Sequence, residues 1–280
     1  MTVLVTGATG KTGVGLIQLL EKDGVPFVAA VRAPNDSSST PQVWFDWTDR
    51  STWASALQGV DSVYLVKPVY GPTLGETVTD FLRQAMSVRR VVLLSEMVRD
   101  SKPDSDPERA AEIAVELSGM EWTILRPSWF FQNFGPGGGY AEHIRTRSEI
   151  ELPAGGATVS LVDTRDVADV AYLALTEDGH SGHCYDLTGP KDVSITDVAA
   201  TISFATGRPI THVSTTLGRY RQQLESGGLA PDRVNYLMDL NTDLAEGRFA
   251  KVTGTHESLT GRAPRTLADF VEEYASFWSA

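Results

Sequence analysis

Three glycines near the N-terminus constrain the fold more than any other feature of the chain. The sequence GATGKTG follows the apolar run Val3–Thr6 and precedes a segment, 12–22, whose apolar residues have helical spacing. Between a strand and a helix, such glycines permit a sharp turn, a close approach to a pyrophosphate and tight helix packing, and the helix N-terminus attracts the anion. The pattern predicts a dinucleotide site; a tight turn without a ligand is the alternative. The predicted phosphate-binding residues are Gly7, Thr9, Gly10, Lys11, Thr12 and Gly13.

The first half of the chain alternates strand-like and helix-like segments. This rhythm predicts an α/β fold, a Rossmann-like doubly wound parallel sheet with helices on both faces. The predicted strands are Phe27–Val31, Gln42–Phe45, Ser62–Val66, Val91–Leu94 and Trp122–Leu125, and the predicted helices are 51–57 (with Ser51 as N-cap), 77–87 and 107–117.

The rhythm breaks after Pro127. Further helices are expected at 165–176 and 195–206, strands at 184–187 and 210–214, and two or three more helical stretches after them. We therefore predict a dinucleotide-binding core at 1–127 and a small C-terminal α/β substrate lobe at 128–280. Part of the second segment is expected to return to the sheet, and the two are expected to form one compact unit.

Charge and composition narrow the classes of partner. The 280 residues carry 24 Lys and Arg against 36 Asp and Glu, a formal net charge of −12, which repels nucleic-acid phosphates. No apolar run approaches the roughly 20 residues of a membrane span, and no signal peptide is evident. The single cysteine, Cys184, excludes an intramolecular disulfide. We expect a cytoplasmic protein with neither a nucleic-acid nor a membrane partner; its oligomeric state is not indicated.

Arg32 follows the second strand, where the adenosine ribose of a dinucleotide would lie. An acidic residue there would accept a hydrogen bond from the 2′-hydroxyl and repel a 2′-phosphate, but no acid occurs before Asp36. Because a guanidinium can hold a phosphate through two parallel hydrogen bonds, we predict NADPH as the cofactor in preference to NADH. A solvated arginine at the end of the strand is the alternative.

Several segments together resemble the NmrA-like atypical short-chain dehydrogenase/reductase family. They are the glycine turn, Phe45-Asp46-Trp47, Val91–Ser95, Trp122–Pro127, Phe130–Asn133, Leu187–Pro190 and Gly261–Phe270. The resemblance implies a Rossmann domain, a small C-terminal lobe and a substrate cleft between them. It also implies that Asp46 and Trp47 flank the adenine, that Val66, Lys67 and Pro68 line the ribose and nicotinamide, and that Ser95, Glu96 and Met97 end the strand beneath it. Members of the family reduce quinones, imines and polyketide or alkaloid intermediates of secondary metabolism, or sense redox state without turnover.

The chain departs from the short-chain dehydrogenase pattern at the expected proton donor. A typical member pairs a serine near Ser95 with Tyr-x-x-x-Lys on the next helix, whereas Asp106–Ile113 contains neither tyrosine nor lysine. Ser95 is the one candidate catalytic residue, and a structural strand-end hydroxyl is its alternative. Arg109 and Glu112 are expected to lie on an exposed helix face.

A dense aromatic stretch follows the strand that ends at Pro127. Its position at the carboxyl side of the sheet, where open α/β folds bind ligands, predicts substrate-binding residues, with ordinary lobe core as the alternative. The candidates are Trp129, Phe130, Phe131, Asn133, Phe134 and Tyr140. His180 and His183 flank a glycine turn with no second ligand cluster, so no metal site is predicted.

The missing acid also constrains the reaction. Reduction of a simple ketone produces an alkoxide that must be protonated, whereas a quinone yields an anion comparable to a phenolate and an iminium becomes neutral. We predict an NADPH-dependent reductase of a small planar aromatic substrate, with a quinone as the first choice of substrate. A reduced quinone can pass electrons to oxygen, which would permit flavin-free hydroxylation of an aromatic polyketide. The alternatives are a non-catalytic NADP(H) redox sensor and an imine or ketone reductase.

Overall fold

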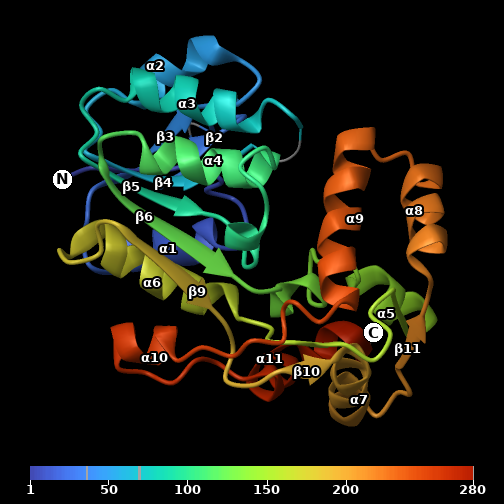
Figure 1. Ribbon diagram of the computed structural model, residues 1–280. Coiled ribbons are helices and arrows are strands. Elements are labelled where there is room, and N and C mark those ends of the chain that lie inside the picture. The colour runs from blue at the N-terminus through green and yellow to red at the C-terminus, as the bar shows by residue number, and fades with distance from the viewer. Residues whose placement is uncertain (36, 69–70, 280) are drawn as a thin grey trace. The chain divides into compact units, whose positions relative to one another are not determined.

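The computed structural model describes residues 1–35, 37–68 and 71–279, and the chain divides into two units (Figure 1). The first contains residues 1–127 and 164–186, and the second contains residues 128–163 and 187–280. Segment 164–186 thus lies with the N-terminal sheet although it follows the first part of the second unit.

The first unit is built on a seven-stranded sheet in the order β3-β2-β1-β4-β5-β6-β9 (Figure 1). All pairings from β3 to β6 are parallel. The order reverses between β1 and β4, so that successive strands are added on opposite sides of β1. The predicted Rossmann-like fold is confirmed. The strands are β1 Val3–Val5, β2 Phe27–Val31, β3 Gln42–Trp44, β4 Ser62–Val66, β5 Arg90–Leu94, β6 Glu121–Pro127 and β9 His183–Leu187.

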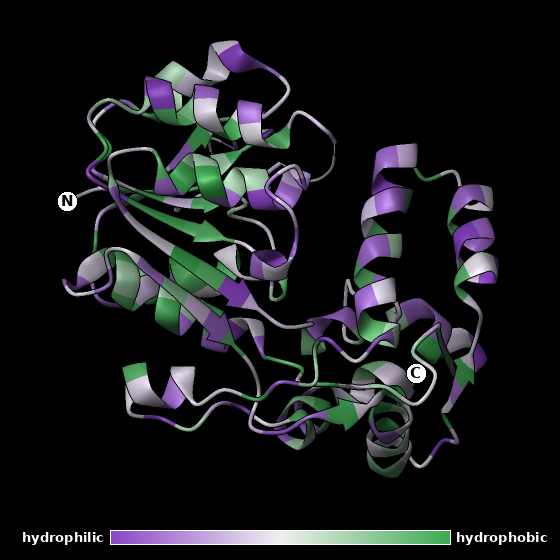
Figure 2. Cartoon of the chain, in the orientation of Figure 1, coloured by the Kyte–Doolittle hydropathy of each residue, from purple (hydrophilic) through white to green (hydrophobic). Residues whose placement is uncertain are grey.

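Two groups of helices cover the sheet. Helix α1 packs against α6, and α3 packs against α4 with α2 beside it (Figure 1). The central strands β1 and β4 are buried along almost their whole length. Figure 2 shows the sheet of this unit as largely hydrophobic. These helices are α1 Gly13–Lys22, α2 Trp53–Ala56, α3 Leu74–Gln84, α4 Pro107–Glu116 and α6 Thr164–Thr176, with single 3-10 turns at Arg50–Thr52 and Arg99–Ser101.

Two predicted helix starts were wrong. Asp49, not Ser51, begins the helical segment: its carboxylate accepts a hydrogen bond from the Ser51 amide and opens a 3-10 turn that continues into α2. Helix α3 begins three residues earlier than predicted, because Leu74 belongs to the same buried stripe as Val78 and Phe81.

The second unit combines helices with two small sheets. Strands β8 and β10 pair antiparallel, and β7 and β11 pair parallel. Four helices follow β11 within the described residues, where two or three were predicted. The elements are a 3-10 turn Phe131–Asn133, α5 Ala141–Arg147, β7 Glu149–Leu152, β8 Thr158–Val159, β10 Val193–Ser194, α7 Ile195–Thr206, β11 Thr211–Ser214, α8 Leu217–Ser226, α9 Pro231–Ala245, α10 Thr255–Thr260 and α11 Leu267–Ser279. None of the helices in the described ranges has the length and apolarity of a membrane span.

Candidate functional site

The predicted cofactor residues all lie at one edge of the sheet. They follow the carboxyl ends of β1, β2, β3, β4 and β5, which point the same way because these strands are parallel. The glycine turn lies beside the point where strand order reverses, between β1 and β4, which is where open α/β sheets bind ligands. The structure therefore places these residues along one edge, although they come from five separate parts of the chain.

The three glycines of the turn have different roles. Gly7 has a φ of +62°, and a side chain on it would meet Val66 at 2.9 Å. A Cβ on Gly13 would lie 2.3 Å from the Gly7 carbonyl oxygen, so α1 could not pack against the turn. A Cβ on Gly10 would lie 3.0 Å from that oxygen, a tight contact, and 3.9 Å from its carbonyl carbon, and the φ of Gly10 is not positive. The fold thus requires glycine at positions 7 and 13. At position 10 the missing side chain leaves room for a ligand beside the turn.

The N-terminus of α1 is available to an anion. Among the described residues, no side chain caps this helix and no acidic residue lies in its first turn. The hydroxyl of its N-cap, Thr12, instead accepts a hydrogen bond from the buried Tyr64 hydroxyl at 3.0 Å. Amide hydrogens and the positive end of the helix dipole therefore favour a phosphate here. Together with the space at Gly10, this arrangement fits the pyrophosphate of a dinucleotide.

Arg32 and Asp46 lie close enough to interact at the ends of β2 and β3. Hydrogen bonds from the backbone and side chain of Thr48 hold the pKa of Asp46 below its usual value, with a smaller contribution from the charge of Arg32. The Arg32 side chain is exposed. Trp47 is half-buried, and its indole N–H donates to the Val66 carbonyl oxygen at 3.2 Å, which joins the ends of β3 and β4.

Lys67 is part of a buried ion network that was not predicted from the sequence. Its ammonium lies 2.8 Å from Glu108 and 3.3 Å from Glu96, and only 8% of its side chain is exposed. Arg99, fully buried, holds the other Glu96 oxygen at 2.6 Å. Burial alone would lower the pKa of Lys67, but the charges of Glu96 and Glu108 outweigh it and keep the pKa above its usual value. Lys67 therefore remains a cation, held by carboxylates of its own unit.

Ser95 belongs to a second buried network. Its hydroxyl donates to the Glu112 carboxylate at 2.6 Å, and Arg126 binds both oxygens of that carboxylate at 2.8 and 2.7 Å. Arg109 adds a further contact at 2.7 Å. The Ser95 proton is therefore directed into the protein, toward Glu112.

The prediction of an exposed helix face at Glu112 was wrong. Glu112 is fully buried and Glu108 is 5% exposed. The spacing contained a signal that was overlooked, because Glu108 and Glu112 fall on the same helical stripe as the buried Ala111 and Val115. The inner face of α4 thus carries two carboxylates where a typical short-chain dehydrogenase has tyrosine and lysine.

The predicted substrate-binding segment lies in the second unit. Phe131 and Phe134 are 2% and 1% exposed and stack on Phe270 and Tyr140 respectively, so they form part of this unit's core. Phe130 and Tyr140 are only partly buried. Trp129 is 9% exposed and packs edge-on against Phe249.

Asn133 and the indole of Trp129 are two polar groups of this segment. The described residues include no hydrogen-bond partner for the buried Trp129 Nε1. The Asn133 backbone amide donates to the Phe130 carbonyl oxygen at 3.1 Å, which closes the 3-10 turn, and its own carbonyl oxygen accepts from the Tyr140 amide.

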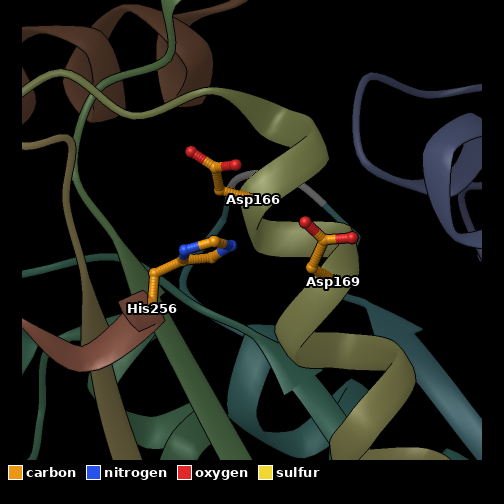
Figure 3. A group of neighbouring side chains, drawn as sticks. All are labelled: Asp166, Asp169 and His256. Atoms are coloured by element: carbon orange, nitrogen blue, oxygen red, sulfur yellow. The ribbon is translucent and has the colours of Figure 1, made fainter. Parts of the chain in front are cut away.

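Two buried carboxylates on α6 were also missed. Asp166 and Asp169 are 1% and 6% exposed, and Figure 3 shows both side chains on α6. Figure 3 also draws His256 of α10 in the second unit, whose Nδ1 lies 3.0 Å from the Arg262 carbonyl oxygen. The prediction that the chain holds no metal stays a prediction.

Comparison with known proteins identifies the family. Residues 7–178 match a family model described as NAD(P)H-binding. The chain is 32% identical to an uncharacterized oxidoreductase, YesF, of Bacillus subtilis, over 99% of this chain and 96% of that one. The chain belongs to the NAD(P)H-binding, NmrA-like atypical short-chain dehydrogenases. It is accordingly an NAD(P)H-dependent oxidoreductase, and the glycine turn described above lies within the matched residues.

Two further members of the family have named activities. The NAD(P)H azoreductase of Xenophilus azovorans is 30% identical over 99% of each chain. The structure of an NADPH-dependent quinone oxidoreductase of Escherichia coli, complexed with NADPH, superposes with a TM-score of 0.81 and 25% identity, covering 97% of this chain and 99% of that one.

Proposed function

We propose that this atypical short-chain dehydrogenase is an NADPH-dependent reductase of a planar aromatic substrate, with a quinone as the first choice. The observation that carries the proposal is the inner face of α4. Glu108 and Glu112 occupy it, and Glu112 binds the Ser95 hydroxyl at 2.6 Å. A site built in this way lacks the usual proton donor.

The chemistry of the substrate must compensate for that lack. Bound NADPH supplies a hydride. A ketone so reduced needs a proton as its alkoxide forms, whereas a hydroquinone anion, comparable to a phenol of pKa about 10, can take its proton from water. The protein's task is then to hold a flat electrophile in the reactive orientation.

The relatives support a conjugated electrophile. One similar protein is named an azoreductase and another a quinone oxidoreductase. Azo compounds and quinones are both flat and conjugated. We extend this substrate class, but no particular compound, to the present chain.

Arg32 supports the preference for NADPH. Its guanidinium is exposed at the end of β2, next to Asp46 at the end of β3. No acidic side chain directly follows β2 to repel a 2′-phosphate, and Arg32 can bind one through paired hydrogen bonds. The Asp46 carboxylate, which hydrogen bonds from Thr48 keep ionised, interacts with the charge of Arg32.

Phe130, Trp129 and Tyr140 are the aromatic residues that we assign to substrate binding. Phe130 and Tyr140 keep part of their surface exposed, and Trp129 carries a buried indole N–H that can donate to a substrate oxygen. Phe131 and Phe134 support them from the core of the second unit.

The test is NADPH oxidation by the full-length protein with a panel of planar quinones, azo dyes, cyclic imines and aliphatic ketones. We expect turnover with quinones or azo dyes and little with the ketones. Efficient reduction of aliphatic ketones would contradict the proposal. Tight NADPH binding without turnover on any class would favour the redox sensor, and selective imine turnover would favour the imine reductase.

A further inference from the structure

Two tyrosine hydroxyls of the second unit meet, although their residues are far apart in the chain. Tyr140 is the N-cap of α5, and Tyr220, on α8, follows it by 80 residues. Their hydroxyl oxygens lie 3.5 Å apart. Tyr140 also stacks on Phe134, and Tyr220 is the one buried residue of α8, with 8% of its surface exposed. The fold thus brings two phenol groups together inside this unit.

A buried amide from α9 lies next to this pair. Helices α8 and α9 pack side by side (Figure 1), and Asn241 of α9 is close enough to Tyr220 to affect the pKa of its hydroxyl. Asn241 is 1% exposed, and its side-chain nitrogen donates to the Leu237 carbonyl oxygen at 2.8 Å. The side-chain oxygen of Asn241 is buried and has no hydrogen-bond partner among the described residues. Since buried polar atoms are almost always bonded, this acceptor requires an explanation.

Both tyrosines keep their protons at neutral pH. Burial raises the pKa of Tyr140 and of Tyr220, and interactions of Tyr220 with Tyr140 and Asn241 offset only part of this effect. Two hydroxyls that bond to each other use one of their two protons, and the described residues supply no acceptor for the other. The 3.5 Å separation is also long for such a bond, which usually measures about 2.7–2.8 Å. The cluster therefore has one unused donor and one unused acceptor.

A hydroxyl group is the simplest ligand group that satisfies both. Its oxygen accepts the tyrosine proton, and its own proton goes to the Asn241 oxygen. A ketone or an ether could satisfy only the donor, and an ammonium only the acceptor. The surroundings suit an aromatic ring, because Phe134 stacks on Tyr140 and Met238 is buried on the same stripe of α9 as Asn241. Tyr140 is partly exposed, so a ligand can reach the cluster.

We propose that Tyr140, Tyr220 and Asn241 form a subsite for a phenolic hydroxyl of the substrate. Tyr220 donates to the hydroxyl oxygen, Asn241 accepts the hydroxyl proton, and Tyr140 orients the Tyr220 hydroxyl. The inference rests on the proposed function and narrows it, because the preferred planar electrophile then carries a hydroxyl substituent, as a hydroxynaphthoquinone does. Tyr220 and Asn241 are specificity-determining residues, since they distinguish a hydroxylated ring from a bare one.

Calorimetric titration of the full chain, saturated with NADP⁺, tests the subsite without turnover. The probes are naphthol, methoxynaphthalene and naphthalene, none of which accepts a hydride. We expect naphthol to bind about ten-fold more tightly than methoxynaphthalene, which can accept a hydrogen bond but cannot donate one. Tyr220→Phe and Asn241→Leu should each remove most of this preference and leave naphthalene binding unchanged. Either variant alone is sufficient, and circular dichroism with NADPH binding would show that it is folded.

The matched control is Tyr185→Phe. It also removes a tyrosine hydroxyl with a hydrogen-bond partner, His180, but in the first unit, so the preference for naphthol should be retained. In steady-state assays, Tyr220→Phe should raise the KM for a hydroxynaphthoquinone about ten-fold with little change in kcat, and leave both constants for naphthoquinone unchanged.

Equal affinity of the wild type for naphthol and methoxynaphthalene would overturn the subsite, as expected if a water molecule occupies the cluster. A preference that both variants retain would overturn it as well. These outcomes are distinct from failure of the proposed function. Absence of quinone turnover would refute the reductase while the naphthol titration still decides the subsite, and turnover without a preference for the hydroxyl would overturn the subsite alone.

Discussion

Replacing Arg126 by methionine should greatly destabilise the protein. Arg126 donates two hydrogen bonds, of 2.8 and 2.7 Å, to a Glu112 carboxylate that is fully buried. Two charge-assisted bonds at about 1.5–3 kcal/mol each give roughly 3–6 kcal/mol, and breaking a buried ion pair costs about 3–5 kcal/mol. Ser95 and Arg109 remain in contact with the carboxylate, which favours the lower part of this range. We therefore expect a loss of about 3–4 kcal/mol in the free energy of unfolding.

Urea unfolding followed by tryptophan fluorescence measures this loss. The control is Arg89→Met, because Arg89 is 57% exposed in its ion pair with Glu121 and should contribute less than about 1 kcal/mol. Adding Glu112→Gln to Arg126→Met should recover part of the stability, since the buried charge is then removed. A loss below about 1 kcal/mol for Arg126→Met, or no recovery in the double variant, would refute the reasoning.

The same network predicts a dependence of stability on pH. Burial by itself raises the pKa of Glu112, but the hydrogen bonds from Arg126 and Ser95 and the Arg126 charge bring it below the usual 4.5. A carboxyl group whose pKa is lower in the folded state stabilises the protein above its unfolded pKa, and this contribution is lost as the pH falls through the folded value. The wild type should therefore lose stability below about pH 4.5, and the Arg126→Met/Glu112→Gln protein should lose less.

Four further predictions follow from the edge of the sheet. Gly10→Val should abolish NADPH binding, measured by fluorescence titration, with the circular dichroism spectrum retained; unchanged affinity would contradict the phosphate assignment. Arg32→Ala should remove most of the preference for NADPH over NADH, about 1.5–3 kcal/mol, in parallel titrations of both cofactors; equal affinities in the parent would favour the solvated arginine. Ser95→Ala should reduce quinone turnover by much less than the ~10²-fold loss of a general acid, and less than Phe130→Ala does at subsaturating substrate; a collapse with normal cofactor binding would reverse this. Burial already raises the pKa of Glu108, and Lys67→Met removes the cation nearest to that carboxylate. The variant should therefore lose stability as the pH rises above about 4.5, the usual pKa of the group. A free energy of unfolding in urea that does not change with pH would disprove this.

The local patterns of the sequence were sufficient for the sheet and the glycine turn. Strand period, glycine spacing and the Asp106-Pro107 helix start are properties of neighbouring residues, so they can be recognised without a structure. The same is true of α7, whose limits Ile195–Thr206 coincide with the prediction because Ser194 and Asp197 form a capping box.

The spacing of Ala111 and Val115 indicates the inner face of α4, but only the tertiary structure decided that two carboxylates are buried on that face. An arginine and a glutamate on a helix are ordinarily solvated, which is why the sequence predicted an exposed face at Arg109 and Glu112. Burial of Glu112 depends on Arg126 from β6 and Ser95 from the end of β5, and burial of Glu108 depends on Lys67 from the end of β4. A buried carboxylate is tolerable only where distant parts of the chain bring donors to it.

The sequence by itself determined a dinucleotide-binding α/β fold, because the necessary signals are short in range: glycine spacing, strand rhythm and the residue that follows each strand. It also showed that tyrosine and lysine are missing from the helix after β5. Only the tertiary structure decided what replaces them, two buried ion networks beneath the cofactor edge, because the energy of a buried charge depends on partners that lie far apart in the chain.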